Sequence, residues 1–180
     1  MAAIAPPLPV KPVCAVTFAP GSDFDEIVSA LETLIGKPDA FSPVYDFDFT
    51  DYYGPEMGPG LKKTFIGFET LVQPSALVRI KRDTNSLEAR WSVGGRRSVN
   101  LDPGYVTSAK LVMASTKDFA HRVFLGEGIY GDVQLQFRHG KWRPSGWTFP
   151  DYLTRLAAAF FSSVLDKYNQ QERQARHAIQ

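Results

Sequence analysis

The chain has 180 residues, 44% of them hydrophobic, with 13 Phe, 7 Tyr and 3 Trp. This composition excludes general disorder, and the length predicts a single globular domain over residues 1–180 with one core. The 20 basic and 19 acidic residues leave a formal net charge of +1, so charge gives no argument for a nucleic-acid partner.

The cysteine count and the N-terminal segment limit the class of protein further. The single cysteine, Cys14, excludes an intrachain disulfide and a cysteine-based metal cluster. The first residues lack the pattern of a signal peptide, and no apolar run has the length of a membrane span. We therefore expect a cytoplasmic protein, with a Pro-rich lead-in over residues 1–11 and a polar, frayed tail over residues 169–180.

The first elements follow hydrophobic periodicity. Residues 13–19 form an apolar, β-branched run that predicts a buried strand, and residues 22–35 repeat apolar side chains at helical spacing, with Ser22 as the expected N-cap. Residues 43–50 alternate aromatic with acidic side chains, which predicts a second strand. Residues 51–60 contain three Gly and two Pro, which predicts an irregular binding loop.

The next elements complete a recognisable order. We expect a strand over residues 63–72, a helix that begins near residue 75, and a short strand over residues 98–101 that ends in an Asp102-Pro103-Gly104 turn. Strand, helix, strand, strand, helix, strand is the order of a ferredoxin-like βαββαβ unit, so the predicted fold is α+β with such a core over residues 13–102. An α+β sheet with another strand order stays open.

The last part should extend that core. Residues 106–115 cluster apolar side chains without alternation, which favours a short helix. Residues 121–142 predict an antiparallel meander, in which Val133, Leu135 and Phe137 point inward and Asp132, Gln134, Gln136 and Arg138 outward. A terminal helix should begin at Asp151.

Polar side chains concentrate between residues 99 and 122, which makes this segment the best candidate for a site. We expect His121 to carry out proton transfer, because an imidazole titrates near neutral pH, with Lys117 and Asp118 as neighbouring catalytic candidates and Lys117 as an anion contact. Anion and ligand contacts are expected from Asn100, Tyr105, Lys110 and Arg122. A buried structural network of the same residues is the alternative.

Two further groups are candidates for the same site. Lys81, Asn85 and Glu88 recur along one flank of the second helix, either as ligand contacts or as a solvated face. Asp51 and Asp102 lie near strand ends and could hold a divalent cation such as Mg²⁺, with turn capping and solvent exposure as the alternative explanation of such carboxylates.

Nucleotide motifs are incomplete. Residues 58–64 contain the Gly, Lys and Thr of a phosphate-binding loop, but Lys62 stands where the second Gly is required. Thr116-Lys117-Asp118 is one residue shorter than a guanine-reading motif. A GTPase is therefore a weaker alternative, as is an RNA-binding domain, because the aromatic side chains of residues 129–138 are expected to point inward.

Several motifs resemble the prokaryotic family of domain of unknown function 4416. The resemblance runs from about Pro12 to Tyr152 and rests on Asp48–Tyr53, Glu56–Lys62, Thr84–Glu88, Val99–Tyr105, Ala114–Asp118, His121–Arg122, Gly128–Tyr130 and Trp147–Tyr152. Members are often labelled GTP-binding proteins, and the family supplies no established activity, cofactor or catalytic residue.

The sequence thus predicts a small enzyme or sensor that binds a phosphate- or carboxylate-bearing molecule, nucleotides included. Its cleft should combine residues 48–56, the flank of the second helix and residues 100–122, with a divalent metal as an optional cofactor. A non-catalytic interaction module, with residues 54–60 and 144–152 as the contact surface, is the alternative. No membrane partner is expected, and a homo-oligomer is left open.

Overall fold

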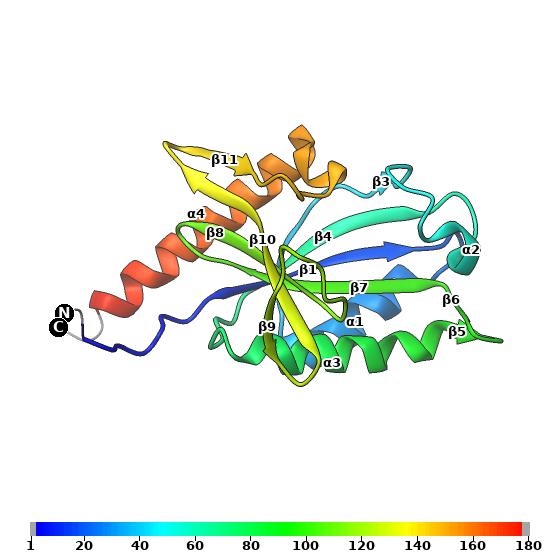
Figure 1. Ribbon diagram of the computed structural model, residues 1–180, viewed down its shortest axis with the longest axis horizontal. Coiled ribbons are helices and arrows are strands. Elements are labelled where there is room, and N and C mark those ends of the chain that lie inside the picture. The colour runs from blue at the N-terminus through cyan, green and yellow to red at the C-terminus, as the bar shows by residue number, and fades with distance from the viewer. Residues whose placement is uncertain (1–2, 178–180) are drawn as a thin grey trace.

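A single antiparallel sheet dominates the computed structural model, which describes residues 3–177 (Figure 1). Its strands run in the order β11–β10–β8–β7–β1–β4–β2, with β3 beside β4 and β9 beside β10. The strands are β1 (Lys11–Phe18), β2 (Pro38–Phe41), β3 (Tyr45–Asp46), β4 (Lys62–Phe68), β7 (Val99–Val106), β8 (Lys110–Ser115), β9 (Val123–Gly126), β10 (Ile129–Arg138) and β11 (Lys141–Pro144). β5 (Ser92–Val93) and β6 (Arg96–Arg97) form a separate hairpin.

The ferredoxin-like core is confirmed. β1, α1 (Phe24–Ile35), β2, β4, α3 (Ala76–Glu88) and β7 follow one another as a βαββαβ unit. Its four strands stand side by side as β7–β1–β4–β2, and each is antiparallel to its neighbour. The predicted C-terminal meander, β9 to β11, and the terminal helix extend this core.

Helices cover both faces of the sheet (Figure 1). α1 and α3 pack on one face through a cluster that includes Leu31, Ile66, Ile80 and Leu101. α4 (Arg155–His177) packs on the other face through Phe160, Phe161 and Val164, against strand residues such as Val13 and Phe65. Among residues 3–177, no helix is both long and apolar enough to cross a membrane.

Helix boundaries differ from the prediction in detail. Asp23, not Ser22, is the N-cap of α1, because its carboxylate accepts the amide of Glu26 at 3.0 Å. A 3₁₀ turn, η2 (Pro150–Leu153), precedes α4, and another, η1 (Ala89–Trp91), follows α3. α4 continues helically through the tail that was expected to fray, and residues 178–180 lie outside the described residues.

The predicted strand over residues 43–50 is wrong. The chain instead forms β2 before it and the two-residue β3 within it, because Pro43 has no amide to continue a ladder. The hydroxyl of Ser42 accepts the amide of Phe65 at 2.9 Å in place of a backbone partner. The glycine-rich loop that follows contains only the four-residue helix α2 (Gly54–Met57).

The turn predicted at Asp102-Pro103-Gly104 and the helix predicted over residues 106–115 are also wrong. β7 runs through the former, and β8 occupies most of the latter, after a turn at Thr107 whose hydroxyl accepts the amides of Ala109 and Lys110. The apolar side chains of β8 do not alternate because both faces are covered, Leu111 and Met113 on the α4 side and Val112 and Ala114 in a cluster with Leu77 of α3.

A β-bulge between Val133 and Leu135 alters the side-chain alternation expected in β10. Asp132 and Gln134, predicted to point outward, are 5% and 0% exposed. The Gln134 amide donates to Asp132 at 2.5 Å, and its oxygen accepts the amide of Phe149 at 3.0 Å. Asp132 and Gln134 thus form a buried polar contact between β10 and the segment before α4.

Candidate functional site

β7 and β8 pair over only three residues, from Gly104 to Val106. Leu101 directs its amide and carbonyl away from β1, toward side chains of α3. Because backbone groups alternate along a strand, Pro103 directs its nitrogen to the same side, where it has no hydrogen to donate. Pro103 therefore ends the pairing with β8, and residues 99–102 have no partner strand on that side in the described part of the chain.

Side chains of α3 take the place of the missing strand. Glu88 accepts the Leu101 amide at 2.7 Å, and the Lys81 ammonium donates to the Leu101 carbonyl at 2.9 Å. Both side chains are buried, so the solvated face considered for this flank is wrong. Asn85 lies between them along α3, half-buried, and its amide has no hydrogen-bond partner among residues 3–177.

Asp102 and Asn100 join this group from β7. The carboxylate of Asp102 accepts the Lys81 ammonium at 3.0 Å and the Asn100 amide at 2.7 Å. Burial alone would raise the pKa of Asp102, but the charges of Lys81 and Lys63 and these hydrogen bonds outweigh it and hold the pKa below its ordinary value. The group is therefore an ion pair with a fixed orientation, 31% exposed at the Asp102 side chain.

Arg97 connects this group to the glycine-rich loop. Its guanidinium pairs with Glu88 and, at 2.9 Å, with Glu56 of α2. Burial raises the pKa of Glu88, and the charges of Lys81 and Arg97 and the bond from Leu101 reduce that rise without cancelling it. Arg97 was missed by the sequence analysis, because nothing in its local pattern indicates a bridge between two distant carboxylates.

A second contact joins the same loop to the β8–β9 connection. The Lys117 ammonium donates to the Tyr52 hydroxyl and lies 3.8 Å from the centroid of that ring. Tyr52 in turn packs edge-on against Tyr53 with ring centroids 5.0 Å apart. Burial, with the charge of Asp102, raises the pKa of Tyr53. The three segments predicted to form the site are thus linked by direct contacts.

Arg122 fixes the β8–β9 connection. Its guanidinium donates to Asp132 at 2.9 Å, to the Ser115 hydroxyl at 2.6 Å and to the Lys117 carbonyl at 3.1 Å, and its side chain is only 5% exposed. His121 is more open, with its imidazole 3.7 Å from Asp132 and stacked on Trp147 at 5.2 Å. Arg122 therefore orients the loop that presents Lys117 and His121.

Other predicted residues do not join this group. Lys110 begins β8 while Ser115 ends it, so about 17 Å of strand separates Lys110 from the loop. Tyr105 packs with Leu77 and Val112 on the α3 face of the sheet. Asp51 and Asp118 are exposed, without a side-chain hydrogen bond or ion pair in the described chain. Within residues 3–177, no three His, Cys, Asp or Glu side chains are placed to hold a metal ion.

A polar row across four strands was also missed. Asn100, Thr17, Lys63 and Tyr45 face one another in register on β7, β1, β4 and β3. Lys63 pairs with Asp151 at 2.7 Å, and the Thr17 hydroxyl is buried with no hydrogen-bond partner among the described residues. The row continues the Asp102 group under the glycine-rich loop, where the ring of Phe47 lies 4.5 Å from the Lys63 ammonium.

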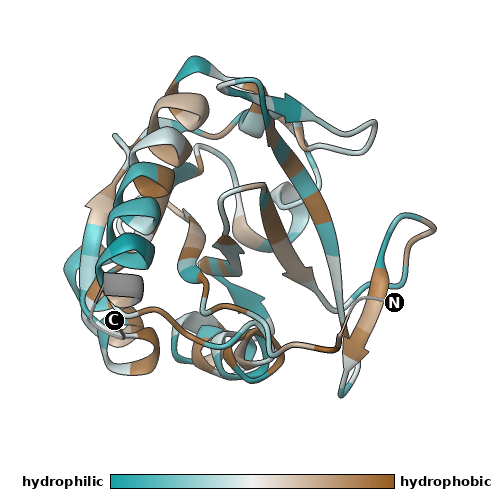
Figure 2. Cartoon of the chain, turned by 90° about the vertical axis from the view of Figure 1, so that its left-hand side faces the viewer, coloured by the Kyte–Doolittle hydropathy of each residue, from teal (hydrophilic) through white to brown (hydrophobic). Residues whose placement is uncertain are grey.

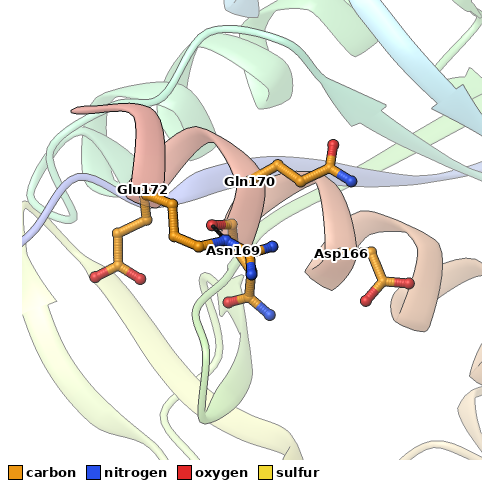
Figure 3. A pocket seen from close by; sticks show the side chains of 5 residues that line it. Asp166, Asn169, Gln170 and Glu172 are labelled. Atoms are coloured by element: carbon orange, nitrogen blue, oxygen red, sulfur yellow. Dashed lines mark hydrogen bonds between the residues drawn. The ribbon is translucent and has the colours of Figure 1, made fainter. Parts of the chain in front are cut away.

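Two hollows of the described surface lie elsewhere. One, of about 490 Å³, is lined only by side chains of α4, from Asp166 to Arg173 (Figure 3). The other, of about 440 Å³, lies between β2 and α4. Neither is lined by residues of the Lys81, Asp102 and Lys117 contacts, so neither hollow is the cleft expected from the sequence.

Acidification tests the Asp102 contacts. A carboxyl whose pKa is lowered by folding stabilises the native state above its ordinary pKa, about 4, and loses that contribution as the pH falls through the lower native value. We expect the stability of the wild type to fall more steeply below pH 5 than that of Asp102→Asn, in urea unfolding measured across that range. Equal slopes would contradict the ion-pair assignment.

Comparison with known proteins supports only a family assignment. No significant match to a curated protein or to a solved structure was found. The family model described as domain of unknown function (DUF4416) matches residues 8–168, which include every contact described above. The chain therefore belongs to the DUF4416 family.

Proposed function

We propose that the protein binds a small molecule carrying a phosphate or carboxylate group, at the surface between the glycine-rich loop, which contains Tyr52, and the β8–β9 connection. One observation carries the proposal. Lys81, Arg97 and Arg122 each already pair with a carboxylate, whereas the Lys117 ammonium has no acidic partner within residues 3–177. A cation held in place beside an aromatic ring is suited to an anionic ligand.

The neighbours of Lys117 add hydrogen-bonding groups of both kinds. His121 follows on the same loop, and the N–H group of an imidazole donates to anions. Asp102 is partly exposed and accepts hydrogen bonds, and Asn85 has an amide without a partner in the described chain. The ligand therefore combines an anionic group near Lys117 with hydroxyl or amide groups that reach Asp102 and Asn85. Neither a metal ion nor a reaction is part of the proposal.

Replacing Lys117 tests this function. A panel of inorganic phosphate, nucleotides including GTP and ATP, sugar phosphates and dicarboxylates is screened by thermal shift, since a ligand that binds only the native state raises the melting temperature. For any compound found, Lys117→Ala should weaken binding by about 10-fold or more in calorimetry, the loss typical of a charged hydrogen bond.

Lys110→Ala is the matched control, because Lys110 is another exposed lysine, at the opposite end of β8. Its affinity should equal that of the wild type. The proposal fails if no compound in the panel shifts the melting temperature, or if both variants bind alike. A rise in melting temperature with GTP but not with ATP would favour a GTP-binding protein over one that binds anionic small molecules in general.

A further inference from the structure

β9 is an edge strand whose three large side chains are all exposed. Val123, Phe124 and Leu125 retain 68%, 59% and 43% of their accessible surface. Figure 2 shows β9 as a hydrophobic strand that stands out at the right of the molecule. Side chains of successive residues point to opposite faces, so both faces of β9 are open.

The free edge of β9 is short and its pairing with β10 contains a bulge, but it has no charge, proline or covering strand among the described residues. β9 pairs with β10 on one side, and no other described strand pairs with it. Edge strands of monomeric proteins are commonly protected by a charge, a proline or a covering segment. β9 has the sequence Val-Phe-Leu-Gly, without charge or proline. A partner strand can therefore add to this edge by backbone hydrogen bonds and cover side chains on both faces.

The apolar surface extends beyond β9. The imidazole of His121 stacks on the ring of Trp147, and its centroid lies 6.0 Å from that of the Phe119 ring. The indole of Trp147 donates to the carbonyl of Val133 on β10. Val133 is two residues beyond Gly131, which pairs with Val123 of β9, so Trp147 lies near β9. Further along the same segment, Phe149 and Leu153 are also exposed. We name the β9 surface by its seven exposed members, Phe119, Val123, Phe124, Leu125, Trp147, Phe149 and Leu153.

The extent of the β9 surface matches a dimer interface. A half-exposed large apolar side chain offers roughly 100 Å², so the seven together offer about 700 Å². Stable interfaces bury about 800 Å² per partner. The exposed apolar side chains on the two faces of β9 and in the neighbouring segments therefore amount to most of the area that a stable dimer needs.

We propose that the β9 surface binds a second copy of this chain, with the two β9 strands antiparallel about a two-fold axis. Two identical strands paired in this way present the same patch to each other, which is the condition for a closed dimer. Since β9 carries no charged residue, the pairing brings no like charges together. The two sheets then continue into one another through the pair.

The oligomeric state in solution tests the proposal. In analytical ultracentrifugation, the wild type should form a concentration-dependent dimer, and Phe124→Lys should raise the dimer dissociation constant by about 30-fold or more, as at a central interface residue. Phe41→Lys is the matched control, because Phe41 is 51% exposed on β2, the strand at the other edge of the sheet. It should dimerise like the wild type.

Chemical crosslinking tests the same interface without introducing a lysine into β9. Cys14 is buried, so Phe124→Cys supplies the reactive thiol. A short bis-maleimide should link two copies of Phe124→Cys and leave Phe41→Cys as single chains. The proposal is overturned if the wild type stays monomeric at every concentration, which is the result expected if the β9 surface binds a different protein. It is also overturned if Phe41→Cys is crosslinked as readily as Phe124→Cys.

Discussion

Asp151→Ala is expected to lower the free energy of unfolding by about 3–5 kcal/mol, because it leaves the buried Lys63 ammonium without its counter-charge. The two side chains are 7% and 2% exposed and lie 2.7 Å apart. Rings of Phe47, Phe65 and Tyr152 surround the ammonium, and the Tyr45 hydroxyl donates to Asp151 at 3.1 Å. Water cannot replace the lost carboxylate in such surroundings without local opening.

Urea unfolding measures this loss, and the neighbouring pair supplies the control. Lys62 pairs with Asp46, but these side chains are 43% and 78% exposed, so Asp46→Ala should change stability by less than about 1 kcal/mol. Adding Lys63→Met to Asp151→Ala should recover most of the loss, since an apolar side chain then fills the same space. Equal effects of the two alanine variants would show that burial of the Lys63 pair is irrelevant.

Gly104→Ala is expected to destabilise the protein by about 3 kcal/mol or more, the upper range for overpacking. A Cβ at Gly104 would lie 2.3 Å from the Val112 carbonyl oxygen and 2.4 Å from the Met113 sulfur. The sulfur can move, but the carbonyl belongs to the β7–β8 pairing, which spans only three residues. The methyl group therefore strains or separates the two strands.

Gly54→Ala is the control for this variant. A Cβ at Gly54 meets nothing within 4 Å, and Gly54 opens α2. Its free energy of unfolding, measured in urea, should stay within about 0.5 kcal/mol of the wild-type value. Should Gly104→Ala be equally mild, the close approach of β7 to β8 would not exist in solution.

The ferredoxin-like core can be predicted from the sequence because each element carries its own local signal. The apolar run before Pro20 and the helical spacing after Asp23 need no distant partner to be recognised. The Asp102-Pro103-Gly104 segment misleads because its residues favour turns locally, whereas pairing with β1 on the other side holds it extended. Tertiary pairing that overrides local preference is invisible in a single sequence.

The candidate site was predictable where spacing or density marks it. Helical spacing places Lys81, Asn85 and Glu88 on one face, and the structure directs that face to β7. The Lys63–Asp151 pair joins residues 88 positions apart, and no local pattern connects them. Arg122 was predicted to bind a ligand because the sequence shows that it is charged. The sequence does not show that the carboxylate of Asp132 already neutralises this charge.

The contacts of α3 with Leu101 also bear on misassembly. An unpaired stretch of strand is normally a template on which another molecule can add and begin to aggregate. Here an intruding strand would have to displace Glu88 and Lys81 and leave two buried charges without their backbone partners. Residues 99–102 of β7 can therefore stay unpaired with β8 without offering an open strand edge in the middle of the sheet.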